Sequence, residues 1–227
     1  MDKPTTILEL PLFPLNLVLF PGMPLPLHIF EERYKLMIER CLEGTRSFGV
    51  ILLREEPDAG SGAIPHTIGT VTRIVRHVRM EDGRYNLVTR GTSRFQLLDS
   101  RTDSGYLTAR VELLDEEEDD PRALAVLRAT VEDEFDGFLD ELTELTGTKR
   151  EPIVFPDDPT AAAYLVAHFL PIYNWEKQRL LEAFSTDMRL VEERRILRRE
   201  RGMIREFGAA PAIYQVDDGN GPRLLQN

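Results

Sequence analysis

The residues of this chain that could do chemistry are few and far apart. The single cysteine, Cys41, and the histidines His28, His66, His77 and His168 share no spacing typical of a metal site or of a nucleophile–base pair. His168 falls in the last turn of an expected helix, where a cation is favoured. We expect Cys41 to be a small core residue and the histidines to be surface or packing residues, with no cofactor, no metal and no catalytic residue.

Carboxylates are abundant, with 39 Asp and Glu residues, so counting alone does not exclude a catalytic pair. Glu31 and Glu32 stand where a helix is expected to begin, and the helix dipole stabilises negative charge there by about 0.3–1 kcal/mol. Arg33 is expected to form a structural ion pair, and Tyr34 to pack inward. We therefore interpret this group as structural.

The composition is that of a globular protein, with 227 residues, 42% hydrophobic residues and 30% charged residues. The net charge of -11 disfavours nucleic acid, which is bound mainly through Lys and Arg, and also disfavours adsorption to anionic membranes. The N-terminus lacks the basic region and long apolar run of a signal peptide. The apolar stretches fall short of the ~20 residues of a membrane helix. We expect a cytoplasmic protein with no membrane partner.

The chain divides into parts that differ in composition and in the spacing of their apolar residues. Residues 7–114 are rich in short β-type runs and turns, whereas residues 122–207 have the period of amphipathic helices. Between them, residues 115–121 form an acidic run that is expected to be an exposed linker. Residues 208–227 have no sustained period and are expected to be a mobile tail. The fold class is therefore α+β.

The most apolar segment of the first part is also rich in proline. In "PLPLHIF" the apolar residues alternate with Pro24 and Pro26, which predicts a strand with one buried face. Because proline has no N–H to donate, this strand must lie at the edge of a sheet or turn its prolines away from its partner. Further along, Asp82-Gly83 between two β-rich runs indicates a hairpin, and the whole part suggests a compact antiparallel barrel or sandwich.

Two long stretches resemble the Lon N-terminal substrate-binding domain: "LPLFPLNLVLFPGMPLPLHIFEERY" and "IGTVTRIVRHVRMEDGRYNLVTRGTSRF". The resemblance continues into "EKQRLLE" and covers roughly residues 8–201. It implies a PUA-like antiparallel pseudo-β-barrel with one inserted helix, followed by a helical bundle that ends in a long helix. The matching signature residues, for which we expect structural roles, are Pro14, Pro21, Gly22, Glu31, Arg33, Tyr34, Gly69, Gly83, Gly91, Arg94, Phe95, Gln178, Leu181 and Glu182.

The motifs of a complete Lon protease are absent from this sequence. It contains no G-x-x-x-x-G-K-[ST] loop for a nucleotide phosphate. None of its lysines, Lys3, Lys35, Lys149 and Lys177, stands in anything like the family's serine–lysine peptidase motif. The resemblance therefore implies a stand-alone, non-enzymatic module that recognises proteins.

The best case for nucleic acid is the run "TRIVRHVR" with Arg73, Arg76 and Arg79, because PUA-like folds can bind RNA. If side chains simply alternate along the strand, these arginines lie on different sides of it. Aromatic residues for base stacking are sparse. We therefore interpret them as residues of solvated strand faces and keep an RNA-binding module as the alternative function.

The last expected helix carries a narrow apolar stripe. Leu190, Leu197 and Ile204 recur every seven residues, which suits packing against one partner helix. That partner is a helix of the same bundle or a helix of a second copy, which would make a homodimer.

The main hypothesis is a protein-recognition module. It would bind unfolded or apolar protein segments, or a partner protein such as an ATP-dependent protease, for which it would act as an adaptor. The contact surface is expected near the junction of barrel and bundle. Its candidate residues are Phe20, Met23 and Trp175, which lie beside turns or at a helix start.

Overall fold

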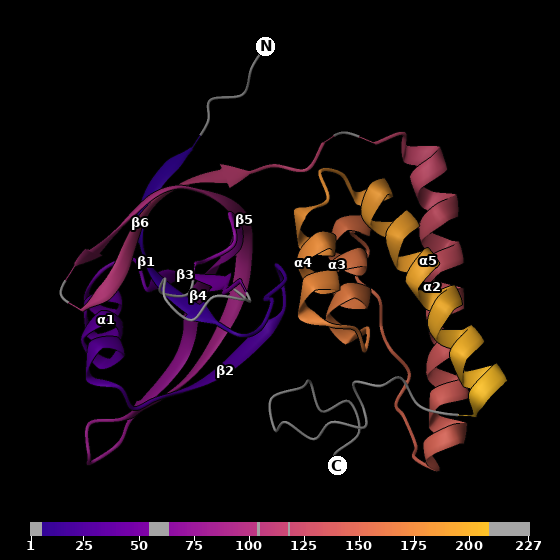
Figure 1. Cartoon of the computed structure of the whole chain (residues 1–227), viewed down its shortest axis with the longest axis horizontal. Coiled ribbons are helices and arrows are strands. Elements are labelled where there is room, and N and C mark those ends of the chain that lie inside the picture. Colours follow the sequence, from indigo (N-terminus) through magenta and orange to yellow (C-terminus); the bar gives the residue numbers. More distant parts are fainter. Residues whose placement is uncertain (1–5, 55–63, 104, 118, 209–227) are drawn as a thin grey trace. The chain divides into compact units, whose positions relative to one another are not determined.

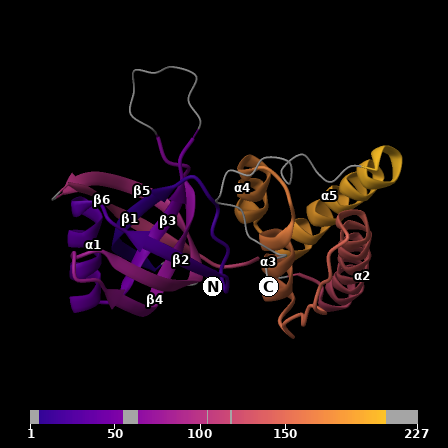
Figure 2. The same cartoon turned by 90° about the horizontal axis from the view of Figure 1, so that it is seen from below.

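The computed structural model describes residues 6–54, 64–103, 105–117 and 119–208 (Figures 1 and 2). They belong to two compact units, the first up to Asp115 and the second from Glu116. The tail predicted over 208–227 lies outside the described residues, except for Gly208. Among the described residues, no helix combines the length and apolar character that a membrane crossing requires.

The first unit is a barrel built on one sheet with the strand order β2-β5-β4-β3-β1-β6. The long strand β5 also pairs with β6, and this pairing closes the sheet on itself (Figure 1). The elements of this unit are β1 (Ile7–Leu15), β2 (Pro24–Ile29), α1 (Glu32–Glu43), β3 (Ser47–Leu52), β4 (Ile68–Arg79), β5 (Tyr85–Asp103) and β6 (Tyr106–Leu114).

All strand pairs of the barrel are antiparallel except β1 with β3, which run parallel. The fully antiparallel arrangement expected from the sequence is therefore wrong at this one pair. The reason is that β1 and β3 are separated by β2 and α1, and this crossover brings the chain back in the same direction. The barrel interior is filled by apolar side chains, among them Leu12, Phe95 and Val111, all fully buried.

Strand β2 lies at the edge of the sheet, as its prolines required. Gly91 N–H donates to Met23 O at 2.9 Å, so the odd-numbered residues of β2 direct their backbone groups toward β5. The even positions Pro24 and Pro26 then face the free edge, with exposed rings and no N–H. This edge offers carbonyl acceptors but few donors, which protects it from pairing with a further strand.

The described part of the second unit contains four helices, and α2 and α5 pack along each other (Figure 1). Asp120 caps α2 by accepting from Arg122 N–H, and Ser185 caps α5 by accepting from Met188 N–H. The helices of this unit are α2 (Pro121–Thr146), α3 (Pro159–Phe169), α4 (Asn174–Glu182) and α5 (Thr186–Phe207).

The apolar stripe of α5 is buried within the chain. Leu190, Leu197 and Ile204 are 1%, 0% and 7% exposed. The stripe therefore packs within its own helical bundle, which was one of the two expected arrangements. It is not available to a second copy of the chain.

Two glycines of the family signature are required by close packing. A Cβ on Gly69 would lie 2.5 Å from Val50 O and 2.6 Å from the Phe95 ring. A Cβ on Gly91 would lie 2.5 Å from Phe20 O. Gly91 also accepts from Gly22 N–H at 2.9 Å, so this contact fixes the proline-rich segment to β5.

Gly69→Ala is expected to lower the free energy of unfolding by about 1–3 kcal/mol, because the added methyl group meets a carbonyl and a core ring that cannot both move. Gly202→Ala adds the same methyl group in α5, where nothing lies within 4 Å of it, and is expected to be neutral or stabilising. Urea unfolding followed by circular dichroism measures both. Equal effects of the two substitutions would contradict the packing argument.

Candidate functional site

Cys41 is buried and unreactive, as the sequence indicated. Its thiol lies 3.4 Å from Ser47 O, to which it donates. Burial raises the pKa of the Cys41 thiol to about 12, so the thiolate is not populated near neutral pH.

The histidines do not gather into a metal site, and among the described residues no group of His, Cys, Asp or Glu is arranged to hold a metal ion. His28 bonds to Asn86 at 2.7 Å on the barrel surface. Burial, with the charge of Lys177, lowers the pKa of His168 to about 4, so the predicted cation at the end of α3 is wrong. Lys177 takes that role instead, because its Nζ donates to His168 O at 2.8 Å.

The "FEERY" segment is structural. Arg33 pairs with Glu31 at 2.8 Å, and its guanidinium lies 4.5 Å from the Tyr34 ring centre. Tyr34 packs edge-on against Phe13, with ring centres 4.4 Å apart. Burial raises the pKa of the Tyr34 hydroxyl. The predicted ion pair of Arg33 and the inward packing of Tyr34 are therefore present.

Other signature residues also have structural environments. Phe95 is fully buried and Arg94 is 3% exposed, and Arg94 donates to Asp115 O at 3.4 Å. Gly83 and Gly22 have φ values of 81° and 80°, which favour glycine. Pro14 lies in β1, half-buried, and Pro21 is buried in the turn that it forms with Gly22. In α4, Leu181 is buried and Gln178 donates to Glu182 at 2.7 Å.

The candidate contact residues differ in exposure. Phe20 is fully buried and Met23 is 9% exposed, so neither offers the free apolar surface for which it was chosen. A position beside a turn did not predict exposure here, because the hydrogen bond between Gly22 and Gly91 holds this segment against β5. Trp175, in the first turn of α4, is 55% exposed and retains the required exposure.

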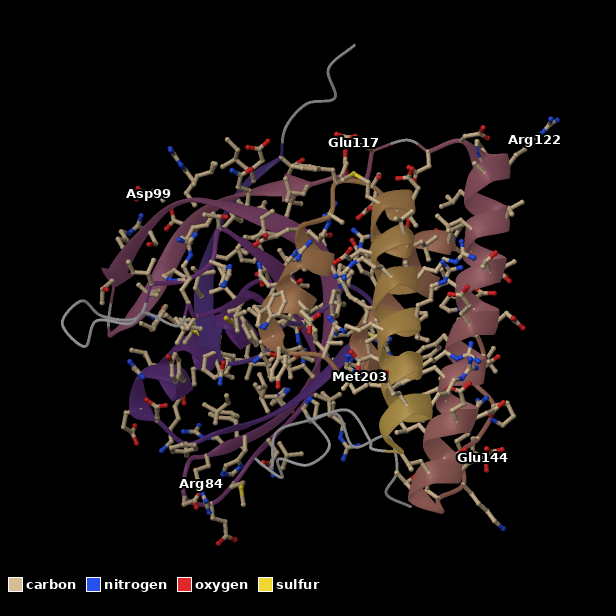
Figure 3. The ribbon with its side chains drawn as sticks, turned by 45° about the vertical axis from the view of Figure 1, so that its right-hand side comes forward. Arg84, Asp99, Glu117, Arg122, Glu144 and Met203 are labelled. Atoms are coloured by element: carbon tan, nitrogen blue, oxygen red, sulfur yellow. The ribbon has the colours of Figure 1, made fainter. Side chains whose placement is uncertain are left out.

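The surface that stands out is one face of β2, β5 and β4, which we call the outer β face. Its residues lie in cross-strand rows and all are exposed. Arg84 marks the turn that joins β4 to β5 (Figure 3). The rows are Pro24–Arg90–Arg73, Pro26–Val88–Arg76 and His28–Asn86–Val78.

A register shift between Ile74 and Arg76 creates the outer β face. The extra residue there is Val75, so Arg76 turns to the same side as Arg73 and Arg79 turns to the other. The interpretation from simple alternation, which separated Arg73 from Arg76, is therefore wrong. Bulges of this kind leave no reliable trace in a sequence pattern of period two.

The second unit contains a buried ion pair that the sequence did not indicate. The guanidinium of Arg189 is fully buried and donates to both carboxylate oxygens of Glu116 at 3.1 Å. It also donates to Leu180 O at 3.0 Å and Ala183 O at 3.1 Å, and lies 4.3 Å from the Tyr164 ring centre. Such a bidentate, fully bonded pair holds one defined geometry.

This pair changes the interpretation of the acidic run 115–121. Glu116 also accepts a hydrogen bond from the Tyr164 hydroxyl, so the expected exposed linker is wrong at this residue. Glu117, directly after it, is exposed (Figure 3). One carboxylate of the run therefore stabilises the helical unit while its neighbour faces solvent.

Glu193, one turn after Arg189 on α5, is a second buried titratable side chain. Neither of its carboxylate oxygens has a hydrogen-bond partner among the described residues. Burial raises the pKa of Glu193 well above its usual value, and the nearby Arg189 opposes this only in part. Burial therefore favours the neutral acid form of Glu193 over the carboxylate.

Comparison with known proteins identifies the family. The chain matches the ATP-dependent protease La (LON) substrate-binding domain over residues 9–199. It is similar to the Lon protease of Anaeromyxobacter dehalogenans, with 30% identity over 203 residues, which cover 86% of this chain and 24% of the relative. The chain therefore belongs to the Lon substrate-binding domain family. It spans about a quarter of the length of the curated relatives it matches.

Solved structures agree with this assignment. The Lon N-terminal domain protein from Xanthomonas campestris has a TM-score of 0.60 and 28% identity, over 82% of this chain and 96% of that one. The N-terminal domain of the Mycobacterium avium complex Lon protease has a TM-score of 0.63 at 18% identity, over 84% and 98% of the two chains. The predicted α+β, PUA-like fold class is confirmed.

Glu116→Ala is expected to lower the free energy of unfolding by ~3–5 kcal/mol, because it leaves the buried guanidinium of Arg189 without its counter-charge. Glu117→Ala removes the adjacent exposed carboxylate and is the matched control, expected to change stability little. Chemical unfolding followed by Trp175 fluorescence reports on this unit. Similar losses for the two variants would show that Glu116 has no special role.

Glu193→Gln is expected to stabilise the protein more at alkaline than at acidic pH. Above the ordinary Glu pKa of 4.5, the unfolded chain releases a proton that folded Glu193 retains. The free energy of unfolding therefore falls as pH rises toward the folded pKa, by at most ~1.4 kcal/mol per pH unit. Unfolding curves of wild type and variant between about pH 5 and pH 8 measure the difference. A difference that stays constant with pH would contradict a neutral Glu193.

Proposed function

We propose that this chain is a non-catalytic protein-recognition module that binds unfolded or apolar segments of other proteins. The observation that carries this proposal is the exposure of aliphatic side chains on the outer β face. Val78 and Val88 are 49% and 40% exposed, and Val75, at the bulge beside them, is 60% exposed. Exposed β-branched residues gathered on one sheet face are typical of contact surfaces.

The backbone of this region favours binding through side chains. Addition of a peptide strand to β2 would need N–H donors along its free edge, and Pro24 and Pro26 lack them. A bound segment would therefore lie across the rows of the outer β face. Trp175, exposed at the start of α4, is a separate candidate contact in the helical unit.

A role as an adaptor in ATP-dependent proteolysis is the finer form of this proposal. Its support is the family, which is that of the substrate-binding domain of the ATP-dependent protease La (LON). Adding the protein to a purified Lon protease with an unfolded substrate would test it. The adaptor role requires a change in the rate of degradation, and an unchanged rate would remove that role while leaving segment binding intact.

RNA binding is the alternative function. The arginines of the outer β face would support it through phosphate contacts. Base stacking needs exposed aromatic rings, and the rows of this face contain only the imidazole of His28, which stacks with Phe30 at 6.1 Å. We therefore place protein segments ahead of RNA.

Replacing Val78 and Val88 together by Ser is expected to weaken binding of a chemically unfolded, carboxymethylated protein by about tenfold, because it removes most of the aliphatic area that the segment would bury. Leu98→Ser is the matched control, since Leu98 is also 40% exposed on β5 but lies outside the rows. Fluorescence anisotropy measures the affinity. Equal losses in both variants, or no binding by wild type, would contradict the proposal.

A further inference from the structure

The outer β face carries positive charge that its own strands do not neutralise. Arg73 and Arg76 are exposed, and among the described residues no carboxylate pairs with either. Arg90 donates from Nη1 to Gly22 O at 2.6 Å and likewise has no carboxylate partner within that set. The rows themselves contain no Asp or Glu.

Arginines without a carboxylate partner are unexpected in this chain, because its 39 acidic residues outnumber its 28 basic residues. On the opposite side of the same strand, Arg79 pairs with Glu39 at 3.2 Å. Arg73 and Arg90, in contrast, stand directly opposite one another across β4 and β5. Like charges in such a cross-strand pair destabilise a sheet. A pair that costs stability and has no internal counter-charge points to an external anion.

The same face also limits what that anion can be. Val78, Val88 and the ring of Pro26 lie in the rows directly beside the arginines. A phosphate or a nucleic-acid backbone would pair with the arginines and leave these apolar groups in water. A purely apolar segment would cover the valines, but it would either leave the guanidinium groups without a counter-charge or remove water from them. A polypeptide that carries both aliphatic and carboxylate side chains matches both parts of the face.

We propose that the outer β face selects protein segments in which aliphatic residues alternate or mix with Asp and Glu, and that it discriminates against segments rich in Lys and Arg. This inference rests on the proposed function, and names the class of segment bound. Arg73, Arg76 and Arg90 act as specificity-determining residues, and Val78 and Val88 supply the contact area common to all segments. Complementary charge orients the segment and rejects partners of the wrong sign.

The test uses the full chain and synthetic peptides that share one set of Leu and Val positions. The remaining positions carry Glu in the first peptide, Ser in the second and Lys in the third. We expect the Glu peptide to bind about tenfold more tightly than the Ser peptide, because a few exposed Arg–carboxylate pairs together contribute that much binding free energy. We expect the Lys peptide to bind most weakly. Raising the ionic strength should narrow these differences.

A variant that combines Arg73→Gln, Arg76→Gln and Arg90→Gln should bind the Glu peptide as weakly as wild type binds the Ser peptide, with the Ser affinity unchanged. Arg110→Gln is the matched control, an exposed arginine on β6 outside the face, and should keep the full preference. Because Arg73 has no partner among the described residues, Arg73→Gln alone should leave the melting temperature equal or higher, which shows that the barrel tolerates the change.

The outcomes separate this inference from the proposed function. If wild type binds the Glu and Ser peptides equally, the inference is overturned and the proposed function stands. If no peptide binds, both are overturned. Tight binding of polyglutamate or of a structured RNA, lost in the triple variant, would show a general anion site and would overturn the mixed apolar–acidic class. Self-association that the triple variant abolishes would identify a second copy as the occupant and would also overturn the inference.

Discussion

The pairing of β4 with β5 is the constraint on which the barrel and its exposed face depend. Strand β5 runs from Tyr85 to Asp103 and bonds to β2, β4 and β6 along its length, so the barrel closes only through this strand. Its register with β4 includes the extra residue Val75, which decides that Arg73 and Arg76 share a side. The same backbone bonds that close the core therefore also determine which side chains the surface presents.

The helical unit depends on a different kind of interaction. Arg189 is fully buried, and the carboxylate that neutralises it belongs to Glu116, in the short segment that leads into α2. A buried pair of this kind adds little net stability over apolar packing but strongly penalises the loss of either partner. Glu193 lies one turn further along α5, and its burial raises its pKa and so disfavours a second charge in this region. The first residue of the second unit is thereby tied to its last helix.

Much of the fold could be predicted from the sequence, because it is encoded locally. The prolines of β2 indicated an edge strand, Asp82-Gly83 indicated the hairpin of β4 and β5, and the glycine-containing motifs indicated the family. The site was harder to predict because its features depend on partners distant in sequence. The bulge at Val75, the burial of Phe20 and Met23 in a segment bonded to Gly91, and the Glu116–Arg189 pair each involve tertiary contacts that no local period reveals.

Mapping of the bound segment on the isotopically labelled protein tests directly whether the outer β face is the recognition surface. Amide chemical shifts of β2, β4 and β5 would be followed by NMR while an unfolded, acidic and aliphatic polypeptide is added. If the outer β face binds the segment, the largest changes fall on the rows that contain Val78, Val88 and Arg76, and β6 and α2 change little. Changes centred on α4 around Trp175, or spread evenly over both units, would contradict the assignment of recognition to the outer β face.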